Sequence, residues 1–132
     1  MKAVKAQELF IKGKNKVGAL AELAKIISSG GVNIRAISAW AVGDEAFFRM
    51  LTSDNAKTKE LLANNGYAFE EKEVVVVELA DKIGQLSLLS DKLKEANIDL
   101  TYIYGTTSKP EHEAILVFSS NDNDKAVEII SS

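Results

Sequence analysis

The residues best arranged for chemistry form a hexapeptide that occurs twice in this 132-residue chain. It reads Asn-Lys-Val-Gly-Ala-Leu at positions 15–20 and Asp-Lys-Ile-Gly-Gln-Leu at positions 81–86, an offset of 66. In each repeat the glycine comes just before an apolar pattern of helical spacing. A helix that begins after a glycine-bearing turn presents unpaired backbone N–H groups and the positive end of its dipole. Both loops are therefore candidate sites for a carboxylate.

The side chains around each loop indicate what else a ligand would carry. Gly18 and Gly84 have no Cβ, so the main-chain atoms of a ligand can come close. We expect Asn15 and Asn33 to lie near the same spot, where their amides donate and accept together, as an α-amino acid with both charges requires. The second repeat has aspartates at both places, which only accept and favour an ammonium group. The predicted ligand-binding residues are Asn15, Lys16, Val17, Gly18, Ala19, Leu20, Asn33, Ile34, Asp81, Lys82, Ile83, Gly84, Gln85, Leu86 and Asp99.

These positions also have purely structural interpretations. Asn15 and Asp81 stand where helix N-caps belong, and the two glycines would also allow close packing of the helices on a sheet. A glycine early in a helix is unfavourable by roughly 1 kcal/mol relative to alanine, which favours the close approach of a ligand as its cause. The lysines of the hexapeptides fit solvated positions. The aromatic residues Trp40, Tyr102 and Tyr104 fit packing in a core or at a module interface.

The sequence gives little support to catalysis. The only histidine, His112, lies between Glu111 and Glu113 in a polar segment that offers no fixed partner for acid–base work. The only arginines, Arg35 and Arg49, fall in expected strands and not in a first loop, where an acylphosphatase holds phosphate. The chain has no cysteine, which removes thiolate metal sites and disulfides. We expect no enzyme, no metal and no cofactor.

The composition and charge of the chain indicate its cellular compartment and argue against some classes of partner. Apolar residues make up 46% of the chain and charged residues 27%, with one proline, which is typical of a folded protein with a core. The net charge of −3 argues against a nucleic-acid partner. The N-terminal residues lack the apolar region of a signal peptide, and no stretch approaches the roughly 20 apolar residues of a membrane span. With no cysteine, we expect a cytoplasmic protein without membrane contact.

The repeat extends over the whole chain and predicts the same order of elements twice. Strands are expected at 9–11 and 74–77, each followed by a helix whose apolar residues recur at three- and four-residue spacing. The helix positions are Leu20, Leu23, Ile26 and Ile27, then Leu86, Leu89 and Leu93. Hairpins are expected at 34–52 and 100–118, aligned with a one-residue insertion, and second helices at 56–63 and 123–130. Residues 67–73 supply a closing strand, which the second repeat lacks.

Strand, helix, two strands, helix and strand is the split βαββαβ pattern of ferredoxin-like domains. We therefore predict an α+β fold with two tandem ferredoxin-like modules, at residues 1–73 and 74–132, the second without its final strand. An uncovered edge invites pairing with another strand. The open edge of the second module is therefore expected to pair with the same edge of another chain, giving a homodimer.

The repeated motif resembles the ACT domain, a βαββαβ module that binds a regulatory amino acid in many enzymes of amino-acid metabolism. The resemblance rests on the hexapeptides and on the pairs Asn33-Ile34 and Asp99-Leu100 that enter the next strand. It implies that asparagines at the places of Asn15 and Asn33 hold an amino acid across an interface between two modules. The chain departs from many members at Val17 and Ile83, where proline is common, and at Gly13, where some have a polar residue.

These features predict a non-catalytic regulatory protein that binds a small free amino acid and signals through assembly or through a separate enzyme or regulator. The alternative is a scaffold that uses the same modules only to associate, without a ligand. Binding of a free amino acid distinguishes the two functions.

Overall fold

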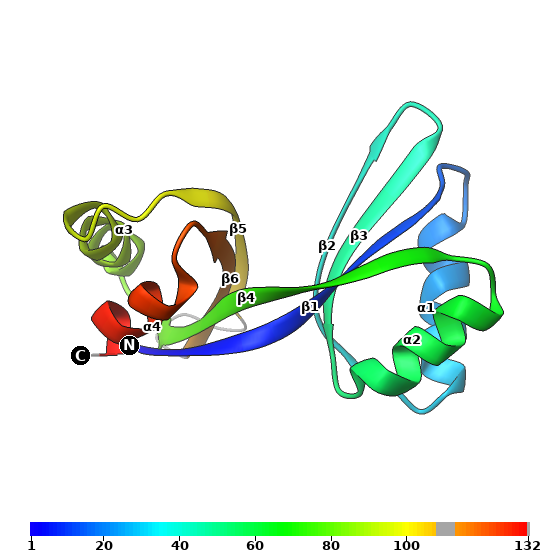
Figure 1. Cartoon of the computed structure of the whole chain (residues 1–132), viewed down its shortest axis with the longest axis horizontal. Helices are drawn as coiled ribbons and strands as arrows, with labels where there is room; N and C mark the ends of the chain where they lie inside the picture. The colour runs from blue at the N-terminus through cyan, green and yellow to red at the C-terminus, as the bar shows by residue number, and fades with distance from the viewer. Residues whose placement is uncertain (108–112, 132) are drawn as a thin grey trace. The chain divides into compact units, whose positions relative to one another are not determined.

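The computed structural model describes residues 1–107 and 113–131 (Figure 1). The elements are β1 (Lys2–Lys14), α1 (Ala19–Ser29), β2 (Ile34–Val42), β3 (Glu45–Thr52), α2 (Asn55–Asn64), β4 (Ala68–Ala80), α3 (Gln85–Glu95), β5 (Leu100–Thr107), β6 (Glu113–Ser120) and α4 (Asn123–Ser131). They belong to two compact units, which we call the first unit (Gln7–Lys72) and the second unit (Met1–Ala6 with Glu73–Ser132). None of the helices in the described ranges is long and apolar enough to span a membrane.

Within the described residues, each unit is built on four strands and two helices. The strand order is β2-β3-β1-β4 in the first unit and β1-β4-β6-β5 in the second. The pairs β1 with β3, β2 with β3, β4 with β6 and β5 with β6 are antiparallel. The predicted α+β class with two ferredoxin-like modules is confirmed.

The first helix of each unit buries the face that its spacing predicts. Leu23 and Ile27 of α1 are fully buried, as is Leu89 of α3. Leu20 and Leu86 were assigned to the same face, yet they are 50% and 56% exposed. Each lies about 60° around the helix axis from the buried leucine three residues later, on the shoulder of the buried face. The first turn of each helix therefore presents an apolar side chain to solvent.

The fourth strand of the second unit is the beginning of the chain. Residues 1–6 belong to this unit, and β1 is the neighbour of β4 in the sheet. Ala3 is 5% exposed within the hydrophobic core of the second unit, and its N–H donates to Ser131 Oγ at 3.1 Å. Lys5 Nζ lies 2.5 Å from Asp124 Oδ1 and 3.7 Å from Glu73 Oε2.

This arrangement corrects two expectations. The division into 1–73 and 74–132 placed residues 1–6 in the other unit, because chain order alone does not reveal which unit a strand joins. The edge of the second unit that was expected to pair with another chain is occupied by residues 1–6 of the same chain. The strands left outermost are β2 and β5.

The hairpin alignment also needs correction. Ile11 pairs with Phe48 in the first unit, and the repeat equivalent Val77 pairs with Leu116 in the second, so the hairpins differ by two residues and not one. The one-residue alignment matched Phe48, which is 3% exposed, with Ile115, which is 39% exposed. A slip of one residue exchanges the two faces of a strand, and the burial pattern identifies the true register.

The role of the N-terminal strand can be tested with neighbouring residues. Replacing Ala3 with aspartate buries an unpaired charge, so Ala3→Asp should lower the free energy of unfolding by about 2 kcal/mol or more. Val4 is 46% exposed, and Val4→Asp should change this free energy by less than about 0.5 kcal/mol. Urea unfolding measures both. Equal losses in the two variants would contradict the packing of residues 1–6 in the second unit.

Candidate functional site

The two hexapeptides form helix starts of the same conformation. Gly18 has φ 86° and ψ 3°, and Gly84 has φ 87° and ψ −2°. Each glycine is the N-cap residue of its helix and no side chain caps either helix, so the N-cap interpretation of Asn15 and Asp81 is wrong. A Cβ built on either glycine meets nothing within 4 Å. The left-handed backbone therefore explains these glycines, and packing of the helix on the sheet does not.

Each helix start leaves backbone donors open. In α1 the N–H of Ala19 donates to Lys16 O, and the N–H of Glu22 donates to Gly18 O. The two N–H groups between them, those of Leu20 and Ala21, make no hydrogen bond to any described residue. In α3 the N–H groups of Leu86 and Ser87 are open in the same way within the described chain. Open donors at the positive end of a helix are the chemistry that the sequence predicted for a carboxylate.

Asn15 holds the first loop against the β2–β3 turn. Its side-chain Nδ2 donates to Gly43 O at 2.9 Å, and its backbone N–H donates to Asp44 O at 2.9 Å. The side-chain oxygen makes no hydrogen bond to the residues that the structure describes. Asn15 therefore fixes the loop with one end of its amide and leaves an acceptor available.

Asn33 lies at the other end of the first unit. It precedes β2, and its N–H donates to Ser53 Oγ at 2.9 Å. An eleven-residue helix, about 16 Å long, separates it from the loop that contains Asn15. The expectation that these two asparagines meet is therefore wrong within one unit.

The corresponding aspartates are separated in the same way. Asp99 follows the eleven-residue helix α3, and its N–H donates to Asn121 Oδ1 at 3.0 Å. Asp81 precedes that helix and is half-buried. In each unit a whole helix therefore lies between the two residues that were expected to meet.

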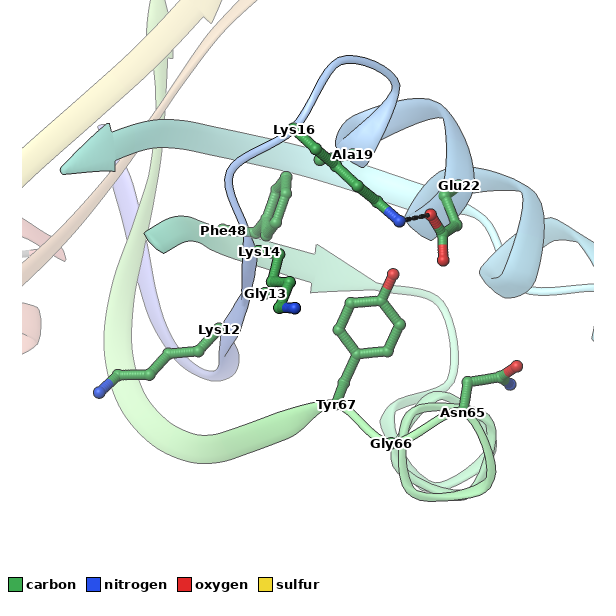
Figure 2. A pocket seen from close by; sticks show the side chains of 10 residues that line it. All are labelled: Lys12, Gly13, Lys14, Lys16, Ala19, Glu22, Phe48, Asn65, Gly66 and Tyr67. Atoms are coloured by element: carbon green, nitrogen blue, oxygen red, sulfur yellow. Dashed lines mark ion pairs between the residues drawn. The ribbon is translucent and has the colours of Figure 1, made fainter. Parts of the chain in front are cut away.

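A pocket of about 190 Å³ lies beside the first helix start (Figure 2). It contains Lys16 and Ala19 from the predicted set, and its other lining residues are Lys12, Gly13, Lys14, Glu22, Phe48, Asn65, Gly66 and Tyr67. Lys16 Nζ and Glu22 Oε2 are 3.0 Å apart at its rim. The turn between α2 and β4 that supplies Tyr67 was not singled out by the sequence, because only the fold brings it beside β1.

The phenol of Tyr67, which lines this pocket, has a shifted pKa. Burial raises the pKa of the Tyr67 phenol above its ordinary value of 10.0, and the carboxylate of Glu22 raises it further, while Lys16 partly offsets these effects. Because the shift is upward, the phenol stays protonated at neutral pH and remains a hydrogen-bond donor.

The second unit has a pocket of about 220 Å³ at its own helix start. It contains four predicted residues, and its lining is Leu79, Ala80, Asp81, Lys82, Gln85, Leu86, Thr106, Ala114 and Leu116. Asp99 lines a separate groove at the other end of α3. The remaining predicted residues, Asn15, Val17, Gly18, Leu20, Asn33, Ile34, Ile83 and Gly84, line neither helix-start pocket.

No group of three or more His, Asp or Glu side chains suited to a metal occurs among residues 1–107 and 113–131. His112 lies outside the described residues.

Comparison with known proteins gives a family and several similar folds. A family model described as "ACT domain pair" matches residues 3–132. No curated protein matches the chain. A crystal structure of a Bacteroides thetaiotaomicron protein is 24% identical, covers 97% of this chain and 88% of that one, and superimposes with a TM-score of 0.89.

Two further structures are aspartate kinases. The ligand-free regulatory subunit from Thermus thermophilus is 11% identical, with 98% of this chain and 95% of that chain covered and a TM-score of 0.69. Escherichia coli aspartokinase III in complex with lysine and aspartate is 15% identical, with 98% and 31% covered and a TM-score of 0.57. At these identities the likeness concerns the fold.

The conformation of the helix starts generates a prediction. Gly18→Ala forces an L residue into the left-handed region and should lower the free energy of unfolding by about 1 kcal/mol. Gly18→Asn should cost less, since asparagine tolerates this region. Gly84→Ala and Gly84→Asn should show the same order in urea unfolding. If alanine were tolerated better than asparagine at both sites, strain at φ would not be the reason for glycine.

Proposed function

Because this chain belongs to the ACT domain family, as a pair of ACT domains, we propose that it is a non-catalytic regulatory protein that binds a small free amino acid. One observation carries the proposal: a glycine-started helix with two open N–H groups occurs at the same place in both units. In the first unit the carboxylate of the ligand accepts from the N–H groups of Leu20 and Ala21. The ammonium group faces the free side-chain oxygen of Asn15.

The first site is completed by a second copy of the chain that pairs through β2. This strand is outermost, most of its nine residues are exposed, and Arg35 is its only charged residue. A long edge strand with so few charges is a template for another strand. The second copy is the natural occupant, because two identical edges satisfy each other under two-fold symmetry.

The side chains of β2 are compatible with such pairing. In an antiparallel pair centred on Ser38, Ala36 of one copy lies opposite Trp40 of the other, and Ile37 lies opposite Ala39. In both of these pairs a large side chain meets a small one, and only at the ends of the strand do two apolar side chains of similar size, Ile34 and Val42, lie opposite each other. The single charge of the strand, Arg35, lies opposite the uncharged Ala41, so the pair brings no like charges together.

This pairing also brings the two asparagines together. Antiparallel strands place the beginning of β2 in one copy beside its end in the other. Asn33 directly precedes β2, and Asn15 is bonded to Gly43 directly after it. Asn33 of the second copy therefore comes to the loop that contains Asn15. A ligand held between them links amino-acid binding to assembly.

The second unit would differ in preference. Its pocket combines the carboxylate of Asp81 with Lys82 and Gln85 over an apolar lining. An acidic side chain at the place of Asn15 strengthens the contact with the ligand's ammonium group and opposes its carboxylate. We propose that the first unit is the tighter amino-acid site and that the output passes to a separate enzyme or regulator.

The binding proposal is tested with the twenty amino acids in a thermal-shift screen followed by calorimetry. A small or polar amino acid should raise the melting temperature, because a ligand at 100 times its Kd adds about 2.7 kcal/mol of stability. Asn33→Ala should weaken its binding by about tenfold. The melting temperature of the free protein should stay unchanged, since the Asn33 side chain makes no hydrogen bond to a described residue.

Asn64→Ala is the matched control, because this exposed asparagine lies at the end of α2. It should leave the affinity unchanged. If none of the twenty amino acids gave heat or a melting shift at millimolar concentration, sensing would be wrong, and a ligand-free dimerisation module would be the function.

The assembly proposal is tested on the two open edges. Ile37 in β2 and Ile103 in β5 are each 40% exposed, so lysine at either costs little in the free chain. Light scattering at micromolar concentration should show a dimer for the natural chain and for Ile103→Lys, and a monomer for Ile37→Lys. A monomeric natural chain, or dissociation by Ile103→Lys alone, would contradict pairing through β2.

A further inference from the structure

The pocket of the first unit contains a feature that the amino-acid site does not use. Gly13 lies in β1 between two lysines, and its φ is not in the left-handed region. Glycine inside a strand weakens the strand and often marks a place where another group approaches closely. The repeat has Leu79 at the equivalent position, 6% exposed in the core of the second unit. Glycine at position 13 therefore leaves space that a leucine fills in the other unit, and the Tyr67 ring occupies part of that space.

The space beside Gly13 is bounded by two rings. A Cβ at this position would lie 3.3 Å from Tyr67 Cε1 and 3.9 Å from Phe48 Cε2. Phe48 is 3% exposed, so the inner wall of the pocket is fixed and apolar. Ala19 of α1 also contributes to the lining. A ligand in this pocket would have an apolar portion of a few heavy atoms.

The rim is polar and mostly cationic. The Tyr67 hydroxyl points toward the Lys16–Glu22 pair (Figure 2) and makes no hydrogen bond to a described residue. Lys14 lines the pocket and has no ion-pair partner in the described ranges. Lys16 and Glu22 are 59% and 50% exposed, so their ion pair contributes little and separates readily. The rim thus offers an unused neutral donor and an unpaired cation, the combination that receives a carboxylate.

We propose that this pocket is a second binding site, which takes a small monocarboxylate with a short apolar chain. The carboxylate accepts a hydrogen bond from the Tyr67 hydroxyl and pairs with Lys14, and the apolar chain lies beside Gly13 against Phe48. The site is contained in the first unit. Unlike the proposed amino-acid site, it needs no second copy of the chain and no ammonium group on the ligand.

Propionate is the probe, and propionamide is its uncharged control. In ¹⁵N-resolved NMR, propionate should shift the amides of Gly13 and Gly66, while propionamide should not. Labelling of the tyrosine ring carbons should show the pKa of Tyr67 rising further with propionate, because a phenol that donates to a carboxylate is held protonated. Equal shifts with the two probes, or an unchanged pKa of Tyr67, would overturn the proposal.

Two variants test the contact with the Tyr67 hydroxyl and the space beside Gly13 separately. Tyr67→Phe removes only the hydroxyl and should weaken propionate binding by about tenfold, the value of a hydrogen bond to a charged group. Gly13→Leu introduces the residue of the other repeat and should abolish binding by filling the pocket. Unaltered affinity in Tyr67→Phe would show that the hydroxyl is not a ligand contact and would contradict the proposal, even if Gly13→Leu failed to fold.

The two proposed sites are distinguished in Ile37→Lys, which removes the expected contact between copies. Propionate should bind this variant with the affinity of the natural chain, whereas the amino acid should bind at least as weakly as it does to Asn33→Ala. Loss of propionate together with the amino acid would show that the pocket depends on the second copy, which contradicts a site contained in one unit.

Discussion

The structure depends on two long strands of its six-stranded sheet, each of which belongs partly to one compact unit and partly to the other. β1 and β4 are thirteen residues long, and the boundary between the compact units passes through both of them. A sheet edge exposes backbone N–H and C=O groups that must be paired or solvated. The first part of β1 closes the second unit, and the first part of β4 closes the first unit. Each unit therefore obtains its fourth strand by an exchange along the chain.

This exchange also places the binding loops. The loop at 15–18 follows the end of β1, whose beginning lies in the second unit, and the loop at 81–84 follows the end of β4, whose beginning lies in the first. Each glycine-started helix therefore follows a strand that is shared between the two units.

A buried ion pair joins β1 to β3 in the first unit. Glu8 is fully buried, and its Oε1 lies 3.1 Å from Arg49 Nη1 on β3. The guanidinium group also lies 4.5 Å from the ring centre of Phe10 and 5.5 Å from that of Trp40. Removing one member would leave the other charge buried without its partner, which costs more than the pair itself contributes. Trp40 also stacks on Phe47, but it is 40% exposed and belongs to neither hydrophobic core.

The sequence by itself determined the features that are local. The repeat, the order of the elements and the buried positions Leu23 and Leu89 follow from patterns in the sequence. The sequence attributed Gly18 and Gly84 to the close approach of a ligand, whereas their backbones in the structure show that the left-handed conformation requires glycine. Only the tertiary structure decided which unit residues 1–6 join and that Tyr67 comes beside Gly13. Those features depend on strand pairing between residues far apart in the chain. The energy of such pairing comes from neighbours that no local pattern specifies.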